Sequence, residues 1–120
     1  MKDFIKNSKQ GDCIVVQKPD DICVIHCKQL LYVVAEGKYS RLYTVDGKSV
    51  LSNLCLMYLE KQLDESFFRC NRKNIINLRY VTKVVTNNVV LDGKEFLVSR
   101  RRKKEFRKRY IDYQVNNYKC

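Results

Sequence analysis

The stretch from Phe67 to Leu78 reads FFRCNRKNIINL, and it decides how the rest of the chain is interpreted. Apolar side chains at both of its ends are expected to be buried in a core. Its middle, from Arg69 to Asn74, is basic and rich in amides, and would be held at the surface as a rigid probe. Arg and Lys pair with phosphates or guanine and Asn pairs with adenine, so this combination suits nucleic-acid recognition. An ordinary solvated loop is the alternative interpretation of the segment taken alone.

Length and charge narrow the class of protein. The 120 residues suffice for one domain with a single core. Lys and Arg number 24 against 13 Asp and Glu, and the resulting net charge of +11 indicates a polyanionic partner. No apolar run approaches the roughly 20 residues that cross a bilayer, and no signal-peptide core follows Met1. We therefore expect a cytoplasmic protein that binds nucleic acid and has no membrane partner.

The six cysteines are expected to stay reduced, because the sequence shows no secretory signal. Cys55 and Cys70 then fit as small core residues. The candidate zinc ligands are Cys13, Cys23, His26 and Cys27. These lack the two close ligand pairs of a zinc motif, and the strand-like alternation of residues 22–27 would point neighbours to opposite faces. We expect no metal and no cofactor.

Short runs of β-branched and aromatic residues predict strands at 13–17, 22–26, 30–34, 41–45, 48–50, 80–85, 89–91 and 94–98. Three two-residue turns that suit positive φ, Asp46-Gly47, Asn87-Asn88 and Asp92-Gly93, join successive strands, which must then be antiparallel. A further bend at Gly37 leaves Lys38, Tyr39 and Ser40 facing outward. The chain has no Gly-rich phosphate loop and no strand–helix alternation, which argues against a nucleotide-binding α/β enzyme.

Two segments have helical spacing instead. One apolar stripe predicts a helix that lies on a sheet, and it consists of Leu51, Leu54, Cys55, Tyr58, Leu59 and Leu63. The basic run at 100–109 continues into Phe106, Tyr110 and Tyr113, whose spacing predicts a second short helix with one side docked, although basic runs are usually solvated. The expected fold class is mainly β, with a tail at 1–12, one domain at 13–110 and a tail at 111–120.

Four segments, in this order and spacing, resemble the LytTR family of bacterial DNA-binding domains. They are LLYVVAEGKYSRLYT (30–44), the DGK turn with SNLCLMYLEKQL (46–48 and 52–63), FFRCNRKNIINL (67–78) and LDGKEFLVSRRRKK (91–104). The resemblance implies an elongated sandwich of short antiparallel strands with one short helix. It also implies a bacterial transcriptional regulator whose loops enter the major groove of double-stranded DNA, usually as two copies on directly repeated sites.

Carried over position by position, the resemblance implies three contact loops. They are Lys38, Tyr39 and Ser40, then Asn71, Arg72 and Lys73, then Arg100 with Arg101 and Arg102 beside it. Base edges would be read by Ser40, Asn71, Arg72 and Arg100, with Ser40 at the family's usual base-reading position of the first loop. Phosphates would be neutralised by Lys38, Lys73, Arg101, Arg102, Lys103 and Lys104.

Some positions depart from the family. Asn71-Arg72-Lys73 replaces a common His-Arg-Ser step, and Asn74 occupies a usually apolar position, so the base preference is expected to differ. Asn77 is expected to be structural and to bond loop backbone. The sequence also contains no phosphate-accepting receiver domain.

Two other functions stay open: dimerisation with a related regulator or with a second copy, and less specific binding of nucleic acid, including RNA, through the Arg-rich end. An enzyme is not expected, because the sole His has no suitable acid or nucleophile partner.

Overall fold

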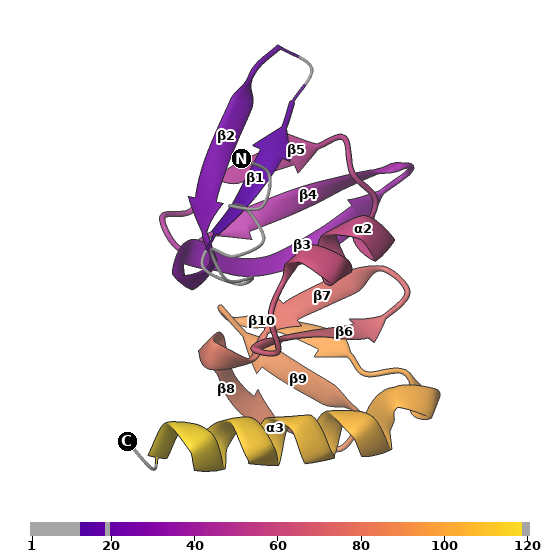
Figure 1. Cartoon of the computed structure of the whole chain (residues 1–120). Helices are drawn as coiled ribbons and strands as arrows, with labels where there is room; N and C mark the ends of the chain where they lie inside the picture. Colours follow the sequence, from indigo (N-terminus) through magenta and orange to yellow (C-terminus); the bar gives the residue numbers. More distant parts are fainter. Residues whose placement is uncertain (1–12, 19, 119–120) are drawn as a thin grey trace.

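A five-stranded antiparallel sheet forms the middle layer of the computed structural model, which describes residues 13–18 and 20–118 (Figure 1). Its strand order is β5-β4-β3-β7-β6. The strands are β3 (Leu30–Glu36), β4 (Tyr39–Thr44), β5 (Ser49–Ser52), β6 (Phe67–Asn71) and β7 (Asn74–Asn77). The deciding stretch of the sequence is therefore the hairpin β6–β7, which pairs through β7 with β3.

Smaller layers lie on either side of this sheet (Figure 1). On one side is a two-stranded hairpin of β1 (Cys13–Gln17) and β2 (Ile22–His26). On the other is a three-stranded sheet of β8 (Val81–Val84), β9 (Asn88–Leu91) and β10 (Lys94–Leu97). The helical elements are η1 (Cys27–Gln29), α2 (Leu56–Gln62), η2 (Leu78–Tyr80), η3 (Arg100–Arg102) and α3 (Lys103–Tyr118). The fold is mainly β and antiparallel, as predicted.

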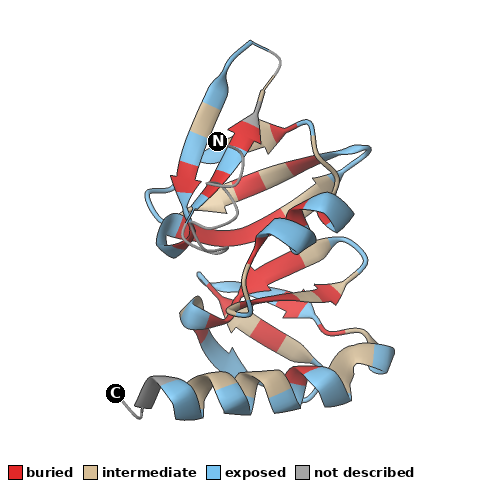
Figure 2. Cartoon of the chain, in the orientation of Figure 1, coloured by how far each residue is buried: buried red, intermediate tan, exposed pale blue. Residues whose placement is uncertain are grey.

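The middle sheet is buried on both faces, which explains its paired apolar residues (Figure 2). Because successive side chains of a strand point to opposite faces, Phe67 packs into one core and Phe68 into the other. Ile75 and Ile76 divide in the same way. One core lies against β1, β2 and α2, and the second against the three-stranded sheet and α3. The predicted anchoring of the polar segment by its apolar ends is confirmed.

Of the three predicted two-residue turns, Asp92-Gly93 has the expected length and the other two differ. The Thr44 amide donates to the Lys48 carbonyl at 3.0 Å, so the turn at Asp46-Gly47 contains three residues, 45–47. Gly47, Asp92 and Gly93 all have positive φ, as expected in turns between neighbouring strands. Between β8 and β9, however, Val85 and Asn88 exchange two backbone hydrogen bonds. The tip of that turn is therefore residues 86–87 and not the predicted Asn87-Asn88. None of these residues has the positive φ that two asparagines had suggested.

The predicted helix at residues 51–63 is partly wrong. Leu51 belongs to β5, where it pairs with Arg41 of β4, and this pairing extends the strand through Ser52. The helix α2 begins only at Leu56. From that start, the core-facing positions are Leu56, Leu59 and Leu63, which are buried, whereas Tyr58 is 52% exposed. Because Leu51 pairs within β5, the helix begins later than predicted, and its apolar face is formed by Leu56, Leu59 and Leu63.

The C-terminal helix is longer than predicted. α3 runs to Tyr118, so residues 111–118 are helical where a tail was predicted. Phe106 is buried, with its ring centroid 5.5 Å from that of Phe68, and Tyr110 and Tyr113 pack against the same core. The docking of Tyr113 extends the ordered domain beyond residue 110. The tail predicted at residues 1–12 lies outside the described part of the chain.

Candidate nucleic-acid interface

Three short connections follow one another along one side of the molecule (Figure 1). They are the β3–β4 turn, the β6–β7 turn and the segment from the end of β10 into η3. Backbone hydrogen bonds join each to the next: the Ala35 amide donates to the Lys73 carbonyl at 2.9 Å, and the Ser99 amide to the Cys70 carbonyl at 2.9 Å. The three predicted contact loops are therefore parts of one continuous hydrogen-bonded edge.

The β3–β4 turn presents two outward side chains. Gly37 has a φ of +62°, a conformation that glycine adopts without strain. Lys38 and Tyr39 are exposed, and the Lys38 ammonium lies 5.8 Å from the centre of the Tyr39 ring. Behind the turn, Arg41 Nε donates to Glu36 Oε2 at 2.6 Å, across the two strands. The ion pair limits the freedom of the turn that carries Lys38.

Ser40 does not belong to this exposed surface. It is fully buried, paired with Ala35 of β3 on one side and Ser52 of β5 on the other. Because Tyr39 points outward, strand alternation points Ser40 inward. Its hydroxyl makes no hydrogen bond within the described part of the structure. The prediction that Ser40 faces outward at a base-reading position is wrong.

The β6–β7 turn carries Arg72 and Lys73 at its tip, and both are exposed. Arg69, which precedes the turn, is partly buried. One of its guanidinium nitrogens donates to the Arg72 carbonyl at 3.0 Å, and the other lies 3.5 Å from a carboxylate oxygen of Glu60 on α2. Arg69 therefore supports the tip from below and leaves Arg72 to face solvent.

Asn71 uses its amide to connect two of the three segments. Its Nδ2 donates to the Leu97 carbonyl of β10 at 2.7 Å, and its Oδ1 accepts from the Lys73 amide at 2.8 Å. The amide of a base-reading Asn would have to be free to pair with adenine. In this structure Asn71 instead braces the β6–β7 turn against the end of β10.

The third segment contains three consecutive arginines with different environments. Arg100 and Arg101 are exposed. The guanidinium of Arg102 lies 4.9 Å from the centre of the Phe68 ring, a cation–π distance, and donates to Glu105 at 3.2 Å. These contacts hold Arg102 against the domain, so Arg100 and Arg101 are the arginines of η3 best placed to reach a ligand.

The second and third segments enclose a hollow of about 450 Å³. It is lined by Arg69, Asn71, Arg72, Ser99, Arg101, Arg102 and Glu105. Four guanidinium groups against one carboxylate favour an anionic ligand such as a phosphate. Arg69 and Ser99 were not among the predicted contacts. The sequence could have identified Arg69 through strand alternation. Arg69 lies between the buried Phe68 and Cys70, so its side chain points to the opposite face of β6.

Asn77 is structural, as predicted. Although only 2% exposed, it donates through Nδ2 to the carbonyls of Leu30 at 2.8 Å and Cys27 at 3.3 Å. Its Oδ1 accepts from the Arg79 amide at 2.9 Å. These bonds join the end of β7 to the start of β3. They also give hydrogen-bond donors to the Leu30 and Cys27 carbonyls, which would otherwise lack partners in the core.

The cysteines differ in exposure. Cys70 is fully buried in the core, as predicted, and burial raises the pKa of its thiol to about 12. Cys55 is only partly buried, at the N-cap of α2. In the proposed zinc set, Cys27 is buried and His26 exposed. Among residues 13–18 and 20–118, no three His, Cys, Asp or Glu side chains are grouped to hold a metal.

Comparison with protein-family models matches residues 20–111 to the LytTr DNA-binding domain. None of the curated proteins matches the chain. Among solved structures, the chain is similar to the LytTr DNA-binding domain of a protein from Bacillus cereus named as a methyl-accepting/DNA response regulator. The TM-score is 0.69, with 82% of this chain and 95% of that chain covered. At 20% sequence identity, the likeness shows a shared fold.

No helix in the part of the chain described is long and apolar enough to span a membrane.

Proposed function

Since the chain belongs to the LytTR family of DNA-binding domains, we propose that it binds double-stranded DNA sequence-specifically and acts as a bacterial transcriptional regulator. The observation that carries this proposal is the row of three hydrogen-bonded segments along one side of the molecule (Figure 1). Two of them are hairpin tips, and all three carry exposed cationic side chains. A narrow β-ribbon fits the major groove of B-DNA, which is about 12 Å wide.

The side chains divide into two roles under this proposal. Arg72 and Arg100 are the base-reading candidates, because both are exposed and a guanidinium can pair with guanine through two hydrogen bonds. Phosphates are neutralised by Lys38, Lys73, Arg101 and Lys104, which are exposed on the same segments or directly after them. Tyr39 packs on sugar beside Lys38. Asn71 and Arg102 hold the second and third segments in place.

Two copies are expected on directly repeated sites. The three contact segments differ from one another, so the interface of a single copy has no two-fold symmetry. Each copy reads its half of the DNA with the same three segments. A direct repeat then places both copies in the same orientation along the duplex, whereas a palindrome would place them in opposite orientations.

Selection of bound duplexes from a random pool tests the proposal. We expect an enriched motif that occurs as a direct repeat; a pool that shows no enrichment would contradict sequence-specific binding. Arg100→Ala should then cost about 1–3 kcal/mol on the selected site and relax the preference at one base pair. The matched control is Arg79→Ala, which removes the same charge from an exposed position in η2. An Arg100→Ala protein that discriminates as well as the control would remove Arg100 from the base-reading role.

A further inference from the structure

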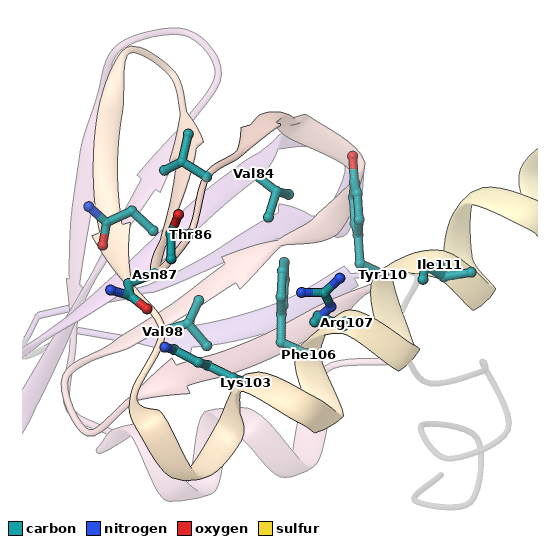
Figure 3. Close-up of a pocket in the computed structure, with 11 residues that line it drawn as sticks. Val84, Thr86, Asn87, Val98, Lys103, Phe106, Arg107, Tyr110 and Ile111 are labelled. Carbon is teal, nitrogen blue, oxygen red and sulfur yellow. The ribbon is translucent and has the colours of Figure 1, made fainter.

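A second feature lies beside the third contact segment, between α3 and the β8–β9 turn. A groove of about 310 Å³ lies there. Figure 3 shows side chains of α3 pointing toward the β8–β9 segment across it. Val98 and Phe106 form its buried apolar floor, and Lys103 and Arg107 lie on its rim. No Asp or Glu is among the residues that line it. The groove therefore suits a peptide segment with an apolar side chain for the floor and acidic side chains next to it for the cationic rim.

The β1–β2 turn of the same chain has this chemistry. Ile22 is 66% exposed, more than any other large apolar side chain in the described part of the chain. Asp20 and Asp21 precede it and are both exposed. Asp21 lies 3.4 Å from the Lys18 ammonium, an exposed pair of little energetic weight. An acidic turn with a projecting isoleucine thus matches a cationic rim with an apolar floor.

The two complementary features lie at opposite ends of the molecule (Figure 1). One copy cannot bring them together, because the molecule measures 41 × 34 × 27 Å. We infer that the β1–β2 turn of one copy docks into the α3 groove of a second copy, with Ile22 against Phe106 and the two aspartates beside Lys103 and Arg107. Such a contact joins two different surfaces and is therefore head-to-tail, and between parallel copies it repeats in one direction.

This arrangement rests on the proposed function, because directly repeated sites also align copies in one direction. The row of contact segments runs along one side of the molecule, from the β3–β4 turn to η3 (Figure 1). Sites one helical turn apart place copies about 34–36 Å apart. The longest extent of the molecule, 41 Å, exceeds this spacing, so copies bound at neighbouring sites come within contact distance when that axis follows the DNA. A contact made by one turn is small and weak alone, and DNA raises the local concentration of the two copies.

Cooperative binding on duplexes tests the inference. The duplexes carry one site, two sites one helical turn apart, or two sites one and a half turns apart, which face opposite sides. We expect the second copy to bind about tenfold more tightly at one turn, and no gain at one and a half turns. Asp20→Arg and Arg107→Glu should each abolish the gain. The double variant should restore it, because the two charges are exchanged and the pair is complementary again.

Ile22→Ser should also abolish the gain, and Val24→Ser is its matched control, since Val24 is 56% exposed on the same strand but away from the turn. Unchanged cooperativity in Ile22→Ser and Arg107→Glu, with single-site binding intact, would overturn the inference and leave the proposed function standing.

Sedimentation at high protein concentration gives a readout that needs no DNA. Weak self-association should disappear in Arg107→Glu and return in the double variant. Equal sedimentation of all these proteins would count against the docked turn, whatever DNA they bind.

Discussion

The brace formed by Asn71 gives the sharpest test of how the interface is held together. Asn71→Asp keeps the size of the side chain and the oxygen that accepts from the Lys73 amide, but it replaces the donor to the Leu97 carbonyl with a carboxylate oxygen. The lost hydrogen bond contributes about 0.5–1.5 kcal/mol, and an oxygen facing a carbonyl across 2.7 Å adds repulsion. We therefore expect a loss of about 1–3 kcal/mol in the free energy of unfolding.

Thermal unfolding and DNA binding measure the two consequences. A loss of this size lowers the midpoint by about 5–15 °C in a domain of this length. The preferences at the base pairs read by Arg72 and Arg100 should weaken together, because their segments are no longer joined. A carboxylate that faces the Leu97 carbonyl should have its pKa raised in the folded protein, because the protonated acid can donate to that carbonyl again. The stability deficit should therefore shrink as the pH falls toward about 4, the ordinary pKa of Asp.

The control is Asn53→Asp, which makes the same change of charge at an exposed position between β5 and α2. Both variants add one negative charge to the chain, so the difference between their unfolding midpoints isolates the brace. If Asn71→Asp melts with the control and keeps the same base preferences, the brace does not organise the interface and the reasoning is refuted.

Three further outcomes follow from buried groups. Asn77→Ala should lower the free energy of unfolding by about 2–4 kcal/mol in urea titrations, because its partners lose buried hydrogen bonds; a loss near zero would contradict its structural role. Phe106→Ala should cost about 3–5 kcal/mol and loosen α3, measured by unfolding followed by circular dichroism. Cys70, whose pKa is raised to about 12, should resist alkylation at pH 8 until the protein unfolds, whereas exposed Cys13 reacts, as mass spectrometry can show; equal labelling rates would contradict this.

Local chemistry in the sequence determined much of the scaffold. Strand alternation predicted which runs pair as antiparallel strands, and Asp92-Gly93 predicted its turn because few residue types adopt positive φ. The spacing of Phe106, Tyr110 and Tyr113 predicted a docked helix, since side chains at i, i+4 and i+7 share one face. The amide of Asn77 indicated a buried structural role, and the excess of Lys and Arg indicated an anionic partner.

The candidate site depended on contacts that no local pattern contains. Ser40 follows a turn and looks exposed in sequence, yet β5 pairs beside it and buries it. Asn71 looks like a base reader, but folding brings it against Leu97, 26 residues away, and that carbonyl takes its donor. Arg102 differs from Arg100 and Arg101 because Phe68 lies against its guanidinium and Glu105 accepts from it. Sequence alone determined the period of each strand and the charge of the chain. The positions of the polar groups relative to DNA were decided only when distant strands met. A side chain that is held by hydrogen bonds inside the fold is no longer free to turn toward a base.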